Sequence, residues 1–196
     1  MTTKFLRAHP RRAMCGLAAL ILIGCSGSSG SGPSSTPLDP TAFGNKYKFA
    51  DNEVSGWTQS TDPTDPFQYG VYSEADLDQR IDGGNMAYIS RGMRVAMFQN
   101  LVGPAGTVCT IVAMDFSTAD NATTMFNYEK DKTSAATAIP PYDDSTAIGY
   151  ETLAGVTAYA HFKASYFETQ VSGVADAAAG AEVGAQLLQV LESKTN

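Results

Sequence analysis

The sequence predicts an α+β fold, in which an antiparallel β-sheet is flanked by helices and the domain is preceded by a signal peptide and a flexible tether. Three observations predict this fold. Short runs of alternating apolar and polar residues indicate strands, and longer runs with apolar residues three and four positions apart indicate helices. Hairpin-length links between successive strands favour antiparallel pairing. The chain has 196 residues, enough for one domain with its own core.

The first 24 residues are typical of a signal peptide that is removed from the mature protein. Residues 1–12 are basic and precede the apolar stretch Ala13–Gly24. This stretch is too short to cross a bilayer, because a spanning helix takes about 20 residues. Arg11 and Arg12 stand before it, but their neighbours match a twin-arginine signal poorly. The general secretory route is therefore favoured, and the twin-arginine route stays open.

The segment Leu22-Ile23-Gly24-Cys25 resembles the lipobox of bacterial lipoproteins. The resemblance implies that diacylglycerol is attached to Cys25, that the chain is cut between Gly24 and Cys25, and that the new N-terminus is acylated. It also implies transfer to the outer membrane, because Ser26 and not aspartate follows the cysteine. Each buried methylene group contributes about 0.8 kcal/mol, so two or three lipid chains anchor stably. The alternative is an ordinary secretory signal with a coincidental cysteine.

Residues 25–42 are expected to form a flexible tether, and residues 43–196 a single folded domain. The tether is rich in glycine, serine and proline, which cannot bury enough apolar surface to order themselves. Loss of the four basic residues in the signal peptide leaves nine Lys and Arg against 20 Asp and Glu. Such a surface repels nucleic acid phosphates and anionic lipid head groups, so no nucleic acid partner is expected.

The first part of the domain is expected to form a strand and a helix. Glu53–Ser60 is the first candidate strand, and the proline-rich turns of Asp62–Pro66 follow it. A helix is expected over Ser73–Gly92, because its first four residues resemble a capping box. The glycine pair at positions 83 and 84 should weaken or interrupt this helix.

The middle of the domain is expected to form a hairpin and a helix. Two strands are expected over Arg94–Val102 and Thr107–Phe116, joined by a turn that contains glycine and proline, and apolar and polar residues alternate in the first of them. A helix is expected over Ala119–Thr133, with Ser117 or Thr118 as its N-cap. Four of its residues recur at helical spacing, and of these Ala122, Met125 and Phe126, but not Glu129, are expected to face the core.

The C-terminal part is expected to form three strands and a final helix. The strands are expected over Ala147–Leu153, Val156–Phe162 and Tyr166–Ser172. The helix is expected over Val174–Ser193, with Val183, Leu187, Leu188 and Leu191 on its buried side. Gly180 and Gly184 give this helix a stripe of small residues, which fits close packing on the sheet or, alternatively, a dimer seam.

The segment Arg80–Tyr88 resembles part of an uncharacterised bacterial family of secreted proteins and lipoproteins, a domain of unknown function. In that family an Ile-Asn-Gly-Gly run precedes a helical stretch with a tyrosine, and here Asp82 takes the place of the usual asparagine. The resemblance continues through Met114–Ala122 and Tyr159–Val171, and it implies a domain boundary but no activity. The order of elements is also similar to the Mog1/PsbP-like fold, whose members bind partners and do not catalyse reactions.

Residues that carry common chemistries are scarce in the mature chain. His161 is its only histidine and stands between apolar residues of an expected strand, which indicates a structural side chain and not a catalytic base. Cys109 is its only cysteine besides Cys25 and stands in an apolar run, which is typical of a buried thiol. These two residues cannot make a zinc site. Asp78–Gly83 fails as a calcium loop, because a basic residue occupies the third position. No metal or cofactor is expected.

Aromatic and hydrogen-bonding residues stand close together in the sequence around the glycine pair. Recognition surfaces commonly combine aromatic faces with polar groups, and glycine lets a ligand approach the main chain closely. The candidate binding surface consists of Tyr69, Tyr72, Asp82, Gly83, Gly84, Asn85 and Tyr88. The alternative is that the tyrosines pack in the core and the glycines only turn the chain.

The sequence therefore favours a membrane-anchored envelope lipoprotein that acts as a non-catalytic binding or accessory module. Its expected contacts are the membrane, through the N-terminal lipid, and an envelope protein or a small ligand. Two alternatives remain. One is a carboxylate-based, glycan-active hydrolase of the envelope, which would need two acidic residues in one pocket, one of them with a raised pKa. The other is a purely structural lipoprotein.

Overall fold

A computed structural model describes residues 38–81, 84–133, 147–153 and 155–196. The chain divides into two units, Met1–Ser35 and Thr36–Asn196, and every described element belongs to the second. The signal peptide, the lipobox cysteine Cys25 and the expected tether up to residue 37 lie outside the described residues, as do Asp82 and Gly83.

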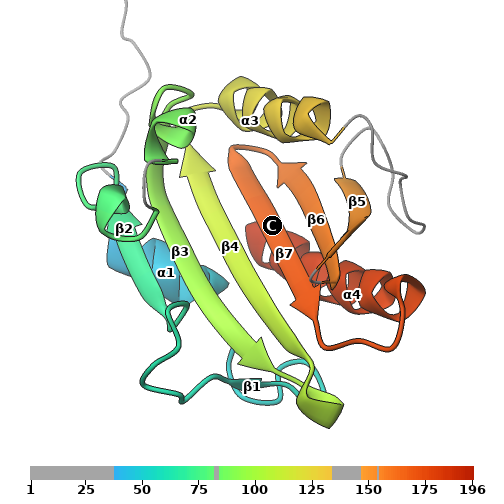
Figure 1. Ribbon diagram of the computed structural model, residues 1–196. Coiled ribbons are helices and arrows are strands. Elements are labelled where there is room, and N and C mark those ends of the chain that lie inside the picture. Colours follow the sequence, from blue (N-terminus) through green and yellow to red (C-terminus); the bar gives the residue numbers. More distant parts are fainter. Residues whose placement is uncertain (1–37, 82–83, 134–146, 154) are drawn as a thin grey trace, which may run out of the picture. The chain divides into compact units, whose positions relative to one another are not determined.

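The centre of the domain is an antiparallel sheet of seven strands (Figure 1). The strands are β1 Thr58–Gln59, β2 Gly70–Ser73, β3 Met93–Val102, β4 Val108–Phe116, β5 Ala147–Thr152, β6 Gly155–Phe162 and β7 Ser165–Ser172. Their order is β1-β3-β4-β7-β6-β5, and β2 pairs with another part of β3. Every pair is antiparallel. Because side chains alternate along a strand, each strand contributes to both faces of the sheet.

The helices begin at identifiable capping residues. They are α1 Pro40–Tyr47, α2 Asn85–Ile89, α3 Ala119–Lys132 and α4 Ala177–Thr195, with two short 3-10 helices, η1 Leu77–Gln79 and η2 Pro104–Gly106. The side chains of Asp39, Thr118 and Asp176 accept hydrogen bonds from backbone N–H groups in the first turns of α1, α3 and α4. Such caps satisfy donors that have no partner within the helix.

One face of the sheet, which we call the covered face, packs against α1 and α4. Its strand residues include Met97, Ile111 and Phe167, and the helices contribute Tyr47 and Leu187 to the same core cluster. In Figure 1 both helices lie behind the sheet. The covered face therefore holds one of the two hydrophobic cores.

The opposite face, which we call the open face, carries the second core. Phe98, Val112 and Tyr159 are among its strand residues, and Met125 and Phe126 of α3 pack on it. Helix α3 crosses one end of the sheet, the upper end in Figure 1. Further along the strands, Thr110, Glu168 and Gln170 face the same way and are partly exposed. Among the described elements no long helix covers that part, so functional side chains can meet solvent there.

The sequence-based interpretation of fold class is confirmed, since the domain is an antiparallel sheet with helices on both faces. The central hairpin, the helix after it and the three C-terminal strands lie within a few residues of their expected bounds. Helix α3 begins after Thr118, one of the two expected caps. These segments were predictable because their local pattern and their tertiary role agree.

Two expectations about the N-terminal half were wrong. The folded chain does not begin at Phe43, because α1 starts at Pro40 and Phe43 lies inside it. The expected helix Ser73–Gly92 is instead the end of β2, the short helix η1 and the short helix α2. The hydroxyl of Ser73 donates to the Asp76 carboxylate at 2.6 Å, a bond between side chains that differs from the side chain to backbone bonds of a capping box. Pairing of β2 with β3 outweighs that local signal.

The small-residue stripe of α4 serves packing within the domain. A Cβ atom added to Gly180 would lie 2.8 Å from Cγ2 of Val156 on β6. Gly180, Ala181 and Gly184 are all buried. The close-packing interpretation of this stripe is therefore confirmed at Gly180, where the helix backbone approaches the sheet too closely for any side chain.

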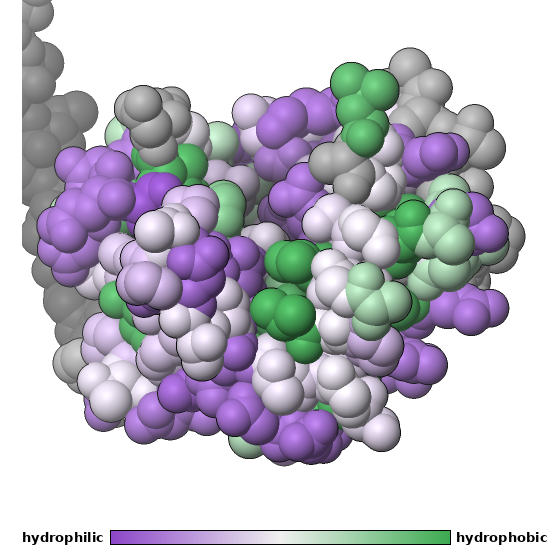
Figure 2. Space-filling view, turned by 60° about the horizontal axis from the view of Figure 1, so that its bottom comes forward, coloured by the Kyte–Doolittle hydropathy of each residue, from purple (hydrophilic) through white to green (hydrophobic). Residues whose placement is uncertain are grey.

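The surface of the domain is mixed in character. Figure 2 shows hydrophilic side chains over most of the viewed face, with hydrophobic ones in separate patches. Large hydrophobic residues with substantial exposure are few among the described residues, and they are Phe67, Met86, Val102 and Leu153. Within the described ranges, every helix is too short or too polar to cross a membrane.

Candidate functional site

A glutamate lies in the middle of the open face. Glu168 of β7 stands directly opposite Val112 of β4 on one side and Tyr159 of β6 on the other. Residues paired in this way have Cβ atoms about 4.5–5.5 Å apart. Tyr166 and Gln170 flank Glu168 along its own strand and face the same way, because alternate residues of a strand share a face. Glu168 is partly exposed although aromatic and aliphatic side chains surround it.

Tyrosines from β5, β6 and β7 form a contiguous group beside this glutamate. The hydroxyls of Tyr150 and Tyr159 share a hydrogen bond of 2.8 Å. The ring centroids of these two residues are 5.8 Å apart, and those of Tyr159 and Tyr166 are 6.1 Å apart with nearly parallel planes. Together the six residues Tyr88, Glu129, Tyr150, Tyr159, Tyr166 and Glu168 form what we call the tyrosine–glutamate cluster.

Helix α3 brings a second carboxylate and a lysine to the cluster. Glu129 is only 4% exposed and follows Met125 and Phe126 on the face of α3 that packs on the sheet. The ammonium nitrogen of Lys132 lies 3.0 Å and 2.8 Å from the two carboxylate oxygens of Glu129. Burial lowers the pKa of Lys132, but the hydrogen bond to Glu129 and the negative charge of that residue together outweigh burial and leave the pKa raised. The expectation that Glu129 would not face the core was wrong.

The carboxyl of Glu168 holds its proton unusually firmly. Burial and, second to it, the nearby charge of Glu129 raise its pKa to about 7, although Lys132 acts in the opposite direction. An isolated charge in an apolar setting is costly, and protonation removes it. Glu168 is therefore partly protonated near neutral pH, and it can either accept or donate a hydrogen bond.

The tyrosine hydroxyls of the cluster are held in their neutral form. Burial, together with the charge of Glu168, raises the pKa of Tyr88, Tyr159 and Tyr166. Tyr166 is fully buried, and its hydroxyl has no hydrogen-bond partner among the described residues. Buried polar atoms nearly always have a partner, so such an exception commonly marks a water or a ligand atom.

The structure does not bring the candidate binding surface together as one surface. Tyr69 packs with the core of the covered face, and Lys48 Nζ lies 4.4 Å from its ring centroid. Tyr72 packs on the open face, with its ring centroid 5.8 Å from that of Phe98. Tyr69 directly precedes β2 and Tyr72 is the third residue of that strand. Because they are three residues apart, the alternation of side chains along the strand places them on opposite faces of the sheet.

The remaining members of the expected surface lie around α2. Gly84 precedes the helix as its N-cap and Asn85 is its first residue. Asp82 and Gly83 are outside the described residues. Of the described members only Tyr88 belongs to the tyrosine–glutamate cluster, where burial and the charges of Glu168 and Glu129 raise the pKa of its hydroxyl. The expected surface therefore shares one residue with the cluster.

Sequence reasoning missed the other members of the cluster for a simple reason. Tyr150, Tyr159, Tyr166 and Glu168 occupy ordinary strands, and nothing local distinguishes them. The only available signal was Glu168, an acidic residue in an otherwise ordinary strand. Alternation along the strands places it on the same face of the sheet as Tyr159 and Tyr150 of the neighbouring strands. Recognising it requires the strand order and register, which the sequence does not specify.

The residues considered for catalysis or metal binding have structural environments. Cys109 is fully buried, and burial raises its thiol pKa, as expected for an inert thiol. His161 stacks on Phe126 at 4.8 Å between ring centroids, and its Nδ1 lies 3.4 Å from the hydroxyl of Thr123. Within the described ranges no group of three or more potential ligands could hold a metal ion.

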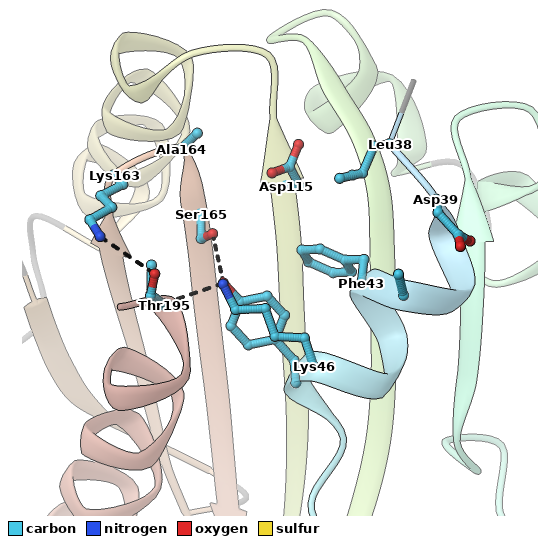
Figure 3. Close-up of a pocket in the computed structure, with 11 residues that line it drawn as sticks. Leu38, Asp39, Phe43, Lys46, Asp115, Lys163, Ala164, Ser165 and Thr195 are labelled. Atoms are coloured by element: carbon cyan, nitrogen blue, oxygen red, sulfur yellow. Dashed lines mark hydrogen bonds between the residues drawn. The ribbon is translucent and has the colours of Figure 1, made fainter. Parts of the chain in front are cut away.

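A separate cavity of about 350 Å³ lies at the edge of the covered face, between α1, the β6–β7 turn and the end of α4 (Figure 3). The hydroxyl of Tyr47 lies 3.1 Å from that of Ser165 and 3.3 Å from that of Thr195. The Asp115 carboxylate is paired with Arg94 at 2.6 Å. These hydroxyl and carboxylate groups thus have partners within the fold, which indicates a structural role.

Comparison with known proteins adds little to this picture. No family model matches the chain, and no curated protein matches it. Among solved structures, the chain is similar to the extracellular domain of PknH from Mycobacterium tuberculosis, with 12% identity, coverage of 81% of this chain and 92% of that chain, and a TM-score of 0.41. So distant a similarity transfers no function, so the site is interpreted from its own geometry.

Proposed function

We propose that the chain is a lipid-anchored lipoprotein of the bacterial cell envelope that acts as a non-catalytic binding module. Its ligand site is the tyrosine–glutamate cluster of the open face. The anchor rests on the lipobox-like segment that ends at Cys25, and the outer membrane as destination rests on Ser26. The tether after Cys25 would let the domain reorient near the membrane.

The observation that carries the ligand site is the partly exposed Glu168 beside the fully buried hydroxyl of Tyr166. That hydroxyl has no partner among the described residues. A carboxyl among aromatic and apolar side chains costs free energy and does not help the fold. Such groups are retained where recognition needs them, and tyrosines beside polar groups are common in recognition surfaces.

A crosslinking experiment tests this function. A photoreactive phenylalanine analogue replaces Gln170, which is partly exposed on the open face next to Glu168. The matched control carries it at Gln186, on the exposed side of α4. After irradiation of cells we expect a specific adduct, a ligand or a partner identified by mass spectrometry, from position 170 only. Identical products from both positions, or none from position 170, would refute the binding site.

A carboxylate-based, glycan-active hydrolase is the second candidate. The observation in its favour is the pair Glu129 and Glu168, of which the latter has its pKa raised to about 7. Glycoside hydrolysis commonly uses one carboxyl group with a raised pKa as general acid and a second carboxylate about 5–10 Å away. Against it, Glu129 is buried and held by Lys132. Turnover of a glycan that disappears in Glu168→Gln would favour the hydrolase.

A further inference from the structure

We infer that the ligand of the tyrosine–glutamate cluster is a small organic cation, whose ammonium group would contact Glu168 and the ring of Tyr150. The inference rests on the proposed binding function and specifies its ligand class.

The first argument is a missing counter-charge. The described salt bridges join Arg94 to Asp115, Lys132 to Glu129 and Lys194 to Glu53. Glu168 takes part in none of them. Lys132 contacts both carboxylate oxygens of Glu129, so its positive charge is paired with Glu129 and not with Glu168. The segments of the domain that the structure does not describe, residues 82–83, 134–146 and 154, contain no Lys, Arg or His. A ligand cation would supply the positive charge for Glu168 that these parts of the chain lack.

The charged and titratable groups around Glu168 come from every element packed on this part of the open face. They are Glu129 and Lys132 of α3, Tyr88 of α2, Tyr150 of β5, Tyr159 and His161 of β6, and Tyr166 of β7, with His161 directly opposite Tyr166. The guanidinium group of Arg80 lies over the ring of Phe98 on β3. Phe98 is separated from Glu168 by Val112 of β4, so the backbones at these two positions are two strand spacings, or about 10 Å, apart. Two carboxylates near one ammonium group disfavour an anionic ligand.

The second argument concerns the tyrosine rings. Tyr159 stands directly opposite Glu168, and Tyr150 and Tyr166 lie on either side of Tyr159. Tyr159 and Tyr166 are buried, and Tyr150 is the partly exposed ring of the three. A cation that contacts the Glu168 carboxylate therefore has the Tyr150 ring as its aromatic face, and such faces attract ammonium groups. The buried hydroxyl of Tyr166 has no partner among the described residues and adds an unsatisfied polar group next to Glu168. Cations already use such faces here, since the guanidinium carbon of Arg91 lies 3.8 Å from the ring centroid of Tyr128.

The third argument favours an organic cation over calcium. Calcium takes roughly six to eight oxygen ligands, and protein carboxylates are prominent among them. Glu129 and Glu168 are the only carboxylates that the structure identifies in the cluster, and no group of three potential ligands occurs among the described residues. An organic cation needs only one carboxylate and an aromatic face.

The test adds three probes to the full-length protein: cadaverine, glutarate and 1,5-pentanediol. The three probes match one another in length. Maltose serves as a neutral saccharide. Binding is followed by amide chemical shifts in NMR. We expect cadaverine to shift resonances around Tyr159 and Glu168, and the other probes to leave them unchanged. The affinity for cadaverine should rise about tenfold from pH 6 to pH 8, because the ionised fraction of a carboxyl group with a pKa near 7 rises by that factor.

Three variants locate the contact. Glu168→Gln should weaken cadaverine binding at least about tenfold and remove its pH dependence. Tyr150→Phe keeps the ring and should bind nearly as wild type, whereas Tyr150→Leu should bind about threefold more weakly or worse. Glu182→Gln, an exposed position on α4, is the matched control and should change nothing.

The outcomes separate this inference from the binding function. Absence of cadaverine binding, or binding that Glu168→Gln leaves intact, overturns the inference that the ligand is an organic cation. If maltose shifts the same resonances and cadaverine does not, the binding module stands and its ligand is neutral. If no probe binds and crosslinking from position 170 captures nothing, both proposals fall.

Discussion

Glu168 is a charged residue in a row of apolar and aromatic neighbours that runs across the sheet. Val112 and Tyr159 flank it on the adjacent strands, and α3 places Glu129 nearby. In water a glutamate loses its proton well below neutral pH, but here burial and repulsion oppose that loss. The local environment, and not the residue type, therefore determines its charge at the pH of the cell.

This environment predicts how stability depends on pH. Between the ordinary pKa of 4.5 and the folded value of about 7, the folded state holds a proton on Glu168 that the unfolded chain has lost. The contribution of Glu168 to the free energy of unfolding is then complete below pH 4.5 and is lost as the pH rises to about 7. Glu168→Gln should remove this loss and raise stability at pH 8 by roughly 1–3 kcal/mol. Urea denaturation at pH 5 and pH 8 measures it.

The matched control for this prediction is Glu192→Gln, because Glu192 is exposed on α4. It should leave the pH dependence of stability unchanged. If Glu168→Gln is destabilising at pH 8 and keeps the wild-type pH profile, Glu168 is ionised and satisfied in the folded state. That result would also remove the missing counter-charge on which the cation inference depends.

At the scale of elements, α4 approaches the sheet unusually closely because Gly180 has no side chain. An added Cβ would lie 2.8 Å from Val156 Cγ2, which is well inside normal contact distance. Gly180→Val should therefore force the helix away from β6 and cost about 1–3 kcal/mol, as overpacked cores do. Thermal or urea denaturation measures the loss.

Ala178→Val is the control on the same helix. Ala178 is exposed in the first turns of α4, so the same new side chain meets solvent there. It should cost only the lower helix propensity of valine, about 0.5 kcal/mol. A Gly180→Val variant of normal stability whose oligomeric state changes would point instead to a dimer seam at this stripe.

At the scale of the whole molecule, a lipid anchor at Cys25 would bind the domain to a membrane. We expect mass spectrometry of the membrane fraction to find an N-terminal cysteine with diacylglycerol and an added acyl chain. Cys25→Ala should yield no such lipidated species, because the thioether to diacylglycerol needs the cysteine sulfur. Wild-type protein that is soluble and unmodified at Cys25 would contradict the anchor.

Local sequence was sufficient where pattern and packing agree. The alternation in β3, the apolar run of β4, the Thr118 cap of α3 and the apolar stripe of α4 each carry their own signal. It was insufficient in the N-terminal half. A serine and an aspartate three residues apart predict a helix start at Ser73, but Gly70–Ser73 gains more from pairing with β3. Helix α1 has a cap at Asp39 and a proline after it, yet the expected tether includes Asp39 and the first three residues of α1, because they adjoin a segment rich in glycine, serine and proline.

The sequence by itself determined the fold class, the acidic character of the mature chain, and the expectation of a signal peptide and a lipobox. Tertiary structure alone decided the candidate site. Tyr88, Glu129, Tyr150, Tyr159 and Glu168 span eighty residues, and strand order and the position of α3 bring them together. Burial and Coulomb interactions depend on distance in space, so the raised pKa of Glu168 and the orphan hydroxyl of Tyr166 exist only once the chain is folded.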